Sequence, residues 1–388
     1  MLYHLYNWIA GHQWISWITP TGMFTGVIFR AAMAIMVSFL IVLLFGGKVI
    51  RWLFKQKVGD RPEFHNATLN ELTKHKGNTP TMGGILIIGA ILISSLLLAD
   101  TTNFYVRMAL FCLVYLAGLG AVDDWLKLTA AHRTPGSRDG MFAWEKLVFQ
   151  IGLGLLLAIF IYMHPNHVPA AATPDPMIDT SHNARFLNWP FLPRDIELWP
   201  WVFYLLTVIV ITGTSNAVNL TDGMDGLAAG CMAIVSFAFL ALTYVTGDYR
   251  WAVTLHFNWV QHTGELAIVC GAITGACLGF LWYNCNPAQV FMGDTGSLAL
   301  GGVIGYVAIV VRQEPMLILI GGIFVMEAVS VIMQVTYFRF TGGKRIFLCS
   351  PIHHHFHLKG WSEQQVVVRF WLISALCAAF GLAMVKLS

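Results

Sequence analysis

Long apolar runs constrain this chain more than any other feature. Runs of roughly 17 to 23 apolar residues recur from one end to the other, and each is long enough to cross the hydrocarbon core of a bilayer. Charged residues make up only 11% of the 388 residues, against about 25% in a typical soluble domain. A fold built from this chain would therefore present a surface too apolar for water, and its natural solvent is lipid.

Ten of these apolar segments are predicted to be transmembrane helices. Membrane barrels need strands in which apolar and polar residues alternate, and the segments lack this alternation. The predicted fold class is therefore an all-α integral membrane protein with about ten transmembrane helices. No linker or internal repeat divides the chain, which indicates one polytopic domain over residues 1–388. The segments lie at residues 23–45, 82–98, 104–122, 145–163, 200–217, 227–246, 264–283, 297–312, 316–338 and 365–387.

Basic residues are unevenly divided between the two sets of loops that alternate along the chain. One set holds fourteen Lys and Arg residues, and the opposite set holds four. The positive-inside rule places the first set in the cytoplasm and both termini on the periplasmic side. The cytoplasmic set comprises residues 46–81, 123–144, 218–226, 284–296 and 339–364.

Three stretches outside the spans have a distinct character. Residues 1–22 contain three tryptophans and no basic signal-peptide region, so they are expected to lie at the membrane interface. Residues 164–199 are rich in proline and predict an irregular periplasmic loop or a small hairpin, and residues 339–364 form the last cytoplasmic loop. The chain has no basic domain and no interleaved basic and aromatic strip, so nucleic acid is not an expected partner.

Two polar motifs border the second and third predicted spans on the cytoplasmic side. Before the second span, Lys76, Thr81 and the backbone amides of a helix start would bind an anion, although a basic flank with a helix cap is the alternative. After the third span come Asp123, Asp124 and Lys127. Adjacent carboxylates repel each other, and a divalent cation or the lysine relieves the repulsion. A functional site is favoured over a solvated helix end because the acids directly follow an apolar span.

Two further motifs combine Asn, Asp and Gly. The first carries Asn219, Asp222 and Asp225, a density of polar groups that a plain turn does not need, so it predicts a site for hydroxyls, amides or a metal. The second carries Asp294 between two glycines, which let the backbone approach a ligand, and Asp294 is a candidate Mg²⁺ ligand. In that motif, Phe291 is either a stacking partner for a base or an aromatic side chain at the membrane interface.

A histidine cluster lies in the last cytoplasmic loop, at His353, His354 and His355. Three consecutive histidines suggest zinc, but neighbouring side chains point in different directions and no acid or cysteine is close in sequence. Phosphate binding or proton transfer is therefore favoured.

Together these residue types favour phosphoryl transfer at the cytoplasmic edge of the membrane. Magnesium binds few carboxylates directly and completes its coordination with water and phosphate oxygens. Three separated acids, two lysines and a histidine cluster suit a reaction in which the protein positions groups and neutralises charge. A site at this edge can meet one water-soluble substrate and one lipid phosphate.

The five motifs, in this order, resemble those of the phospho-N-acetylmuramoyl-pentapeptide transferases, within the polyprenyl-phosphate N-acetylhexosamine-1-phosphate transferase superfamily. The matching stretches read TPTMGG, DDxxK, NAVNLTDGxDGLA, PAQVFMGDTGSLALGG and PIHHHF, and the likeness covers nearly the whole chain. The resemblance implies ten transmembrane helices, a homodimer and the bacterial cytoplasmic (inner) membrane. It also implies Mg²⁺-dependent transfer of phospho-MurNAc-pentapeptide from UDP-MurNAc-pentapeptide to undecaprenyl phosphate, a membrane lipid. Lipid I and UMP would form, in the first membrane step of peptidoglycan synthesis.

The resemblance also implies roles for individual residues. Asp123, Asp124 and Asp294 match essential acids, and Asp294 matches the magnesium ligand. Two residues depart from the family pattern and leave local loop geometry open: Asn78 replaces a common glycine, and His357 a common acid. The residues that match substrate-binding positions are Lys76, Thr81, Asn219, Asp222 and Asp225 in the nucleotide and cation site, Lys127, Asn284 and Phe291 in the uridine region, and His353, His354 and His355 in the motif for muramoyl-peptide specificity.

Several alternatives remain open at the level of sequence. Asp123 either orients or deprotonates undecaprenyl phosphate for direct attack on the β-phosphate, or an aspartyl-phosphate intermediate forms. A related transferase of N-acetylhexosamine-1-phosphate would share the Asp motifs but not PIHHHF. A transporter would place charges near the bilayer midplane, where this chain has mainly Arg30 and Glu327. Glu327 is expected to be a buried, hydrogen-bonded acid rather than a proton relay.

Overall fold

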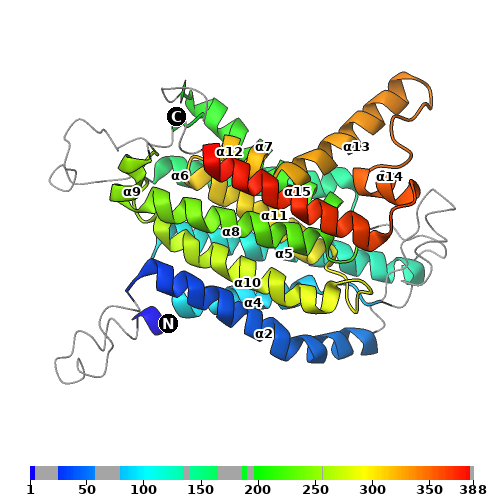
Figure 1. Ribbon diagram of the computed structural model, residues 1–388, viewed down its shortest axis with the longest axis horizontal. Helices are drawn as coiled ribbons and strands as arrows, with labels where there is room; N and C mark the ends of the chain where they lie inside the picture. The colour runs from blue at the N-terminus through cyan, green and yellow to red at the C-terminus, as the bar shows by residue number, and fades with distance from the viewer. Residues whose placement is uncertain are drawn as a thin grey trace.

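Helices account for nearly all the regular structure of this chain (Figure 1). The computed structural model describes residues 1–4, 25–56, 79–133, 140–164, 186–189, 196–255 and 257–384, without the side chains of 130–133. Most of the interfacial segment expected at 1–22 therefore lies outside the described residues. In the stretch 164–199, β1 (Phe186–Leu187) pairs antiparallel with β2 (Ile196–Glu197), so the structure contains the small hairpin that was one of the two expectations.

Each predicted apolar segment corresponds to helix, which confirms an all-α membrane fold. In the described part of the chain, nine helices are long and apolar enough to cross a membrane, and the 15-residue α4 is a shorter apolar helix. The short elements are α9 (Tyr249–Thr254), η3 (Thr263–Glu265) and α14 (Ile352–Leu358). The helices that match the ten segments are α2 (Val27–Lys55), α4 (Gly84–Leu98), α5 (Phe104–Arg133), α6 (Ala143–Met163), α7 (Pro200–Thr221), α8 (Leu227–Gly247), α10 (Leu266–Asn284), α11 (Gly293–Val310), the pair α12 (Glu314–Ile320) and α13 (Gly322–Phe340), and α15 (Glu363–Met384).

Three boundaries differ from the prediction. Helix α5 continues about three turns beyond residue 122, because the next residues are good helix formers and its two aspartates are buried by neighbouring helices. The segment predicted at 316–338 is split at Gly321, and α13 then leaves the bundle at an angle (Figure 1). The loop predicted at 339–364 contains α14, which carries the histidines.

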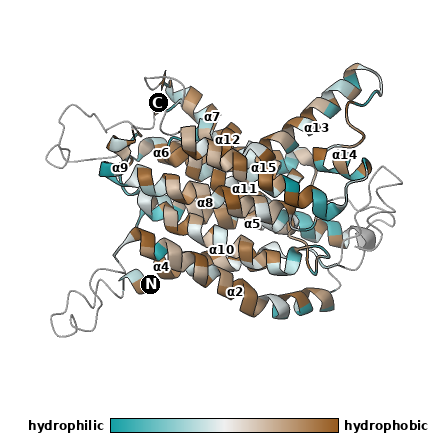
Figure 2. Cartoon of the chain, viewed as in Figure 1, coloured by the Kyte–Doolittle hydropathy of each residue, from teal (hydrophilic) through white to brown (hydrophobic). Residues whose placement is uncertain are grey.

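Helix α11 is the centre of the bundle. Every residue from Asp294 to Val310 is buried, and the helix packs mainly against α5 and α7. Its start also touches α4 closely: a Cβ atom added to Gly84 would lie 2.2 Å from the backbone nitrogen of Gly296, so a side chain has no space there. Apolar residues dominate along the helices, whereas polar residues gather towards their ends, notably around α14 (Figure 2).

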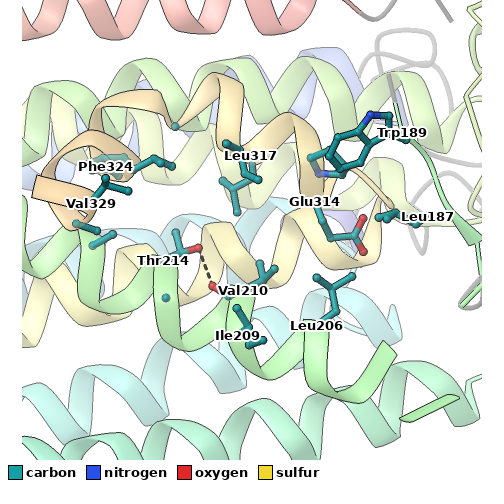
Figure 3. A pocket seen from close by; sticks show the side chains of 17 residues that line it. Leu187, Trp189, Leu206, Ile209, Val210, Thr214, Glu314, Leu317, Phe324 and Val329 are labelled. Atoms are coloured by element: carbon teal, nitrogen blue, oxygen red, sulfur yellow. Dashed lines mark hydrogen bonds between the residues drawn. The ribbon is translucent and has the colours of Figure 1, made fainter. Parts of the chain in front are cut away.

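An apolar groove lies where α13 separates from α7 (Figure 3). Its volume is about 360 Å³, and it is lined by α7, α12, α13, the end of β1 and Trp189. Apolar side chains dominate the lining, and the carboxylate of Glu314 lies at one end beside Leu206 and Leu187 (Figure 3).

The two charged residues expected near the middle of spans have different positions. Arg30 lies in the first turn of α2, near a bundle end rather than at midspan, and its Nη1 donates to Glu265 Oε2 at 2.8 Å. Glu327 lies on the buried face of α13 and has an exposed fraction of 0%. The expectation that Glu327 is buried is confirmed, and its partner is described below.

Candidate active site

Three acids from two helices meet at one end of the bundle. Asp123 and Asp124 lie on α5, and Asp294 lies in the first turn of α11. All three are buried, and they present carboxylate oxygens that lie within 4.8 Å of one another. The structure thus brings together the three acids that the sequence motifs singled out, from positions 170 residues apart.

Two lysines bridge Asp123 and Asp294. Lys127, one turn after Asp123, places its Nζ 2.7 Å from Asp123 Oδ2 and 3.2 Å from Asp294 Oδ1. Lys146, from α6, places its Nζ 2.7 Å from an oxygen of each acid. Two ammonium groups beside three carboxylates leave the cluster short of positive charge, a balance that suits a site for an added cation.

Lys146 was missed by the sequence analysis. It lies inside the fourth predicted span, at 145–163, and so was counted neither as a loop residue nor as part of a motif. The signal that could have found it is a lysine in the first turn of an otherwise apolar helix, where a charge is costly unless it is used or solvated.

Asp124 has a different environment from the other two acids. Its carboxylate accepts hydrogen bonds from the backbone nitrogens of Asp294 and Thr295, at 3.1 and 3.0 Å, and from Thr295 Oγ1 at 2.7 Å. These donors are the free N–H groups of a helix start, so Asp124 acts as the cap of α11 from a neighbouring helix. Gly293, just before, has φ +74°, a conformation that favours glycine.

Asn219 and Asp222 extend the site from the end of α7. Asn219 Nδ2 donates to Asp294 Oδ1 and to Ser297 Oγ, each at 2.9 Å. Asp222 follows the helix, and its backbone N–H donates to the carbonyl oxygen of Asn219 at 3.2 Å. Burial, and then the nearby carboxylates of Asp294 and Asp124, raise the pKa of Asp222 to about 7.

The remaining predicted residues organise the loops around the cluster. Thr81 is buried beside Gly293: a Cβ atom added to that glycine would lie 3.0 Å from Thr81 Oγ1. The side-chain amide of Asn284 accepts from Gly226 N at 3.0 Å and donates to Val290 O at 2.8 Å. This amide thus ties the start of α8 to the loop before α11.

Asp225 belongs to a second polar network, on the same loop but apart from the acid cluster. Its Oδ2 accepts from Asn286 Nδ2 at 3.0 Å and from Ala288 N at 3.1 Å. Glu363, at the start of α15, accepts from Asp225 N at 2.9 Å. Phe291, in the following loop, is half-buried, and its backbone N–H donates to the carbonyl of Pro80 at 2.8 Å.

The three histidines lie on α14 in different settings. His353 and His354 are buried, with ring centroids 4.1 Å apart, and both face the turn at Gly223. His355 Nδ1 accepts from Leu348 N at 3.0 Å. Within the described residues, the cluster of metal-compatible side chains comprises Asp123, Asp124 and Asp294 and contains none of these histidines.

Two residues from the first motif cannot be placed. Lys76 and Asn78 lie outside the described residues. The other departure from the family pattern, His357, is placed with its Nδ1 3.0 Å from the carbonyl oxygen of Trp361.

A divalent cation that prefers oxygen ligands fits the donors present. Asp123 and Asp294 offer converging carboxylate oxygens, which the two lysine ammonium groups now bridge. Mg²⁺ binds carboxylate oxygens in proteins. When a cation is coordinated by the acids, the lysine ammonium groups could pair with a phosphate group instead.

Comparisons with known proteins found a matching family model and several similar relatives. The model of glycosyl transferase family 4 matches residues 106–312, and a signature of the phospho-N-acetylmuramoyl-pentapeptide-transferases matches residues 76–88. Proteins named phospho-N-acetylmuramoyl-pentapeptide-transferase are similar over nearly their full length. The one from Desulfotalea psychrophila is 42% identical, covering 100% of this chain and 99% of the relative. The one from Thermodesulfovibrio yellowstonii is 40% identical, covering 100% of this chain and 99% of the relative. One from Rickettsia bellii is 40% identical, covering 94% of this chain and 95% of the relative.

Proposed function

This chain belongs to glycosyl transferase family 4 and, within it, to the phospho-N-acetylmuramoyl-pentapeptide transferases, and on that premise we propose its reaction. It transfers phospho-MurNAc-pentapeptide from UDP-MurNAc-pentapeptide to undecaprenyl phosphate, giving lipid I and UMP in peptidoglycan synthesis. The observation that carries this proposal is the buried cluster of Asp123, Asp124 and Asp294 bridged by Lys127 and Lys146.

The cluster suits transfer of a phosphoryl group between two phosphate-bearing substrates. Lys127 and Lys146 would pair with phosphate oxygens of the nucleotide sugar, and Asp123 would orient or deprotonate the acceptor phosphate. Asp294, together with Asp123, would hold Mg²⁺, which would supply positive charge to the pyrophosphate group of the nucleotide sugar as UMP departs. Asp124, whose oxygens are engaged by the start of α11, would keep Asp294 in place.

Asp123 supports direct displacement better than an aspartyl-phosphate intermediate. Its Oδ1 accepts from Met141 N at 2.7 Å, and its Oδ2 lies 2.7 Å from both lysine ammonium groups. A carboxylate with both oxygens engaged by donors is well held for positioning and poorly exposed as a nucleophile. A phospho-enzyme trapped in a single turnover would contradict this route.

The membrane arrangement is also proposed. The ten helical segments would cross the bacterial inner membrane, with α4 as the shortest span, both termini periplasmic and the acids at the cytoplasmic end. The excess of basic residues in the loops at that end supports this orientation. We also propose a homodimer, as the family resemblance implies. Cysteine labelling of the two termini in intact and permeabilised cells would test the orientation.

Release of UMP by the purified protein tests the proposed reaction. The protein would receive UDP-MurNAc-pentapeptide, undecaprenyl phosphate and Mg²⁺ in detergent. Release that depends on the lipid and is abolished by EDTA is the expected result. Turnover of UDP-N-acetylglucosamine instead, with none of the muramoyl nucleotide, would indicate the related N-acetylhexosamine-1-phosphate transferases.

A further inference from the structure

Glu327 forms a buried pair with one of the motif histidines. Glu327 on α13 and His353 on α14 each have an exposed fraction of 0%, and Glu327 Oε2 lies 3.1 Å from His353 Nδ1. In the described part of the chain, neither Glu327 oxygen and neither His353 nitrogen has a hydrogen-bond partner. A buried carboxylate without a partner is costly, so the close approach of Glu327 and His353 is the interaction that can offset this cost for both side chains.

The pair is seated on the one face of α13 that packs into the protein. The buried residues of α13 include Glu327, Ser330 and Gln334, at helical spacing along one face. Gln334 holds the following loop, accepting from Ile346 N and Phe347 N, each at 3.0 Å. The face with which α13 meets α14 is therefore polar, although α13 as a whole is an apolar helix.

The opposite edge of His353 meets the turn that carries Asp222. A Cβ atom added to Gly223 would lie 2.4 Å from His353 Nε2, so the imidazole ring packs directly on this turn. Asp222, the preceding residue, donates its backbone N–H to the carbonyl oxygen of Asn219 at 3.2 Å, and Asn219 Nδ2 donates to Asp294 Oδ1 at 2.9 Å, in the first turn of α11. A continuous line of contacts thus runs from Glu327 through His353 and the turn to the helix that presents Asp294.

We propose that Glu327 and His353 are positioning residues, which hold the Asp222–Gly223 turn against the start of α11. The Glu327 carboxylate would accept a hydrogen bond from Nδ1–H of the His353 ring. This bond would fix the tautomer of the ring and direct Nε2 at the turn. A leucine and a phenylalanine could fill the same volume without the desolvation cost of two polar groups. A role in directing His353 Nε2 at the turn would explain why the pair is polar. The inference rests on the proposed function, together with the family resemblance, which implies that Asp222 lines the nucleotide and cation site.

A double-mutant cycle tests the pair. Glu327→Gln, His353→Gln and the double variant would be compared for UMP release, with UDP-MurNAc-pentapeptide varied at saturating undecaprenyl phosphate. Each single variant is expected to raise KM for the nucleotide about tenfold with a smaller change in kcat, and the double variant about tenfold rather than a hundredfold. Glu314→Gln, which removes another buried acid far from the turn, is the matched control and should retain wild-type kinetics.

Two results would overturn the proposal. One is multiplication of the two single effects, and the other is an unchanged KM for the nucleotide in folded Glu327→Gln. If Glu327→Gln does not fold, Gly223→Ala tests the same contact from the other side, because its Cβ would displace His353, and an unchanged KM there would equally reject the pair. Calorimetric binding of UDP-MurNAc-pentapeptide to the same variants measures nucleotide affinity without turnover. It therefore tests the Glu327–His353 pair separately from the proposed reaction. Inactive wild-type protein would refute the proposed reaction, whereas an active enzyme with independent variants would refute only the pair.

Discussion

Both ends of α11 carry a buried polar cluster, but the groups are closely paired at its start and poorly paired at its end. At its start, Asp294 meets two lysines and Asn219, and every contact is at hydrogen-bond or ion-pair distance. At its end, Arg312, Gln313 and Glu314 are buried as well, yet Arg312 and Glu314 approach only to 3.9 Å. In the described chain several of their polar atoms have no partner, including both side-chain amide atoms of Gln313. The clusters are about 27 Å apart, from the rise of an 18-residue helix.

The difference shows that convergence, rather than burial, marks the candidate site. The start of a helix offers free N–H groups and positive potential, which carboxylates satisfy, and Asp124 uses them to fix α11. At the other end, Arg312 adopts φ +59° in a tight turn and lies over the Phe203 ring, 5.0 Å from its centroid. This second cluster joins two helices without bringing several charges to one point. If function follows this geometry, substitutions at the start of α11 should impair turnover and a substitution at its end should not.

Asp294→Asn should have the largest effect. The change removes the charge that both lysines and the proposed cation share, while it keeps the size of the side chain. We expect UMP release to fall by about a thousandfold or more, as for loss of a group that stabilises charge in the transition state. The rate should be measured by single-turnover release of UMP, with circular dichroism to confirm folding. Activity within tenfold of wild type would remove Asp294 from the proposed site.

Lys146→Met should lower turnover by about a hundredfold. The variant keeps most of the unbranched side chain but leaves Asp123 and Asp294 bridged by Lys127 alone. The neighbouring carboxylates then repel each other, and the substrate phosphate loses a partner. The measurement is kcat for UMP release, with Lys127→Met as the parallel variant. Because Lys146 is less exposed than Lys127, at 17% against 34%, we expect its loss to be the more damaging of the two. A Lys146 variant with wild-type kcat would limit this lysine to a structural role.

The fold could be predicted from the lengths of the apolar runs, because the bilayer thickness imposes them. The errors lie where tertiary packing overrides hydropathy. Helix α5 continues past Asp123 because α6 and α11 bury its acids, and no local pattern reports that burial. The break at Gly321 likewise depends on α13 turning away to carry α14, a long-range arrangement.

The site was predicted where polar residues cluster in sequence and missed where they stand alone. The acids form recognisable motifs, so their convergence was expected. Lys146 sits by itself in an apolar helix, and only the packing of α6 against the site gives it two partners. Asn284 stays a predicted residue of the uridine region, and its side-chain amide also bonds to two backbone groups that a sequence cannot show to be near.

Asp124→Asn should affect stability more clearly than the other acid variants. In the wild type, one Asp124 oxygen accepts hydrogen bonds from Thr295 N and Thr295 Oγ1. The variant places an NH₂ donor there, so buried donors at the start of α11 would face another donor. A cost of about 1–3 kcal/mol in unfolding free energy is expected, from unsatisfied buried groups. Thermal unfolding in detergent measures it, with Asp294→Asn as the comparison. An unchanged unfolding temperature would mean that Asp124 does not anchor the helix.

Glu314→Gln should have the smallest effect and no effect on turnover. The change keeps the size of a buried side chain and removes a carboxylate that approaches Arg312 only to 3.9 Å, so little interaction is lost. We expect wild-type kcat for UMP release and a loss of about 1 kcal/mol or less in the free energy of unfolding, measured by thermal unfolding in detergent. Glu197→Gln, at an exposed acid on β2, is the control and should match the wild type in both measurements. If Glu314→Gln instead impaired UMP release at constant stability, both ends of α11 would serve the reaction, and the contrast drawn from their geometry would be wrong.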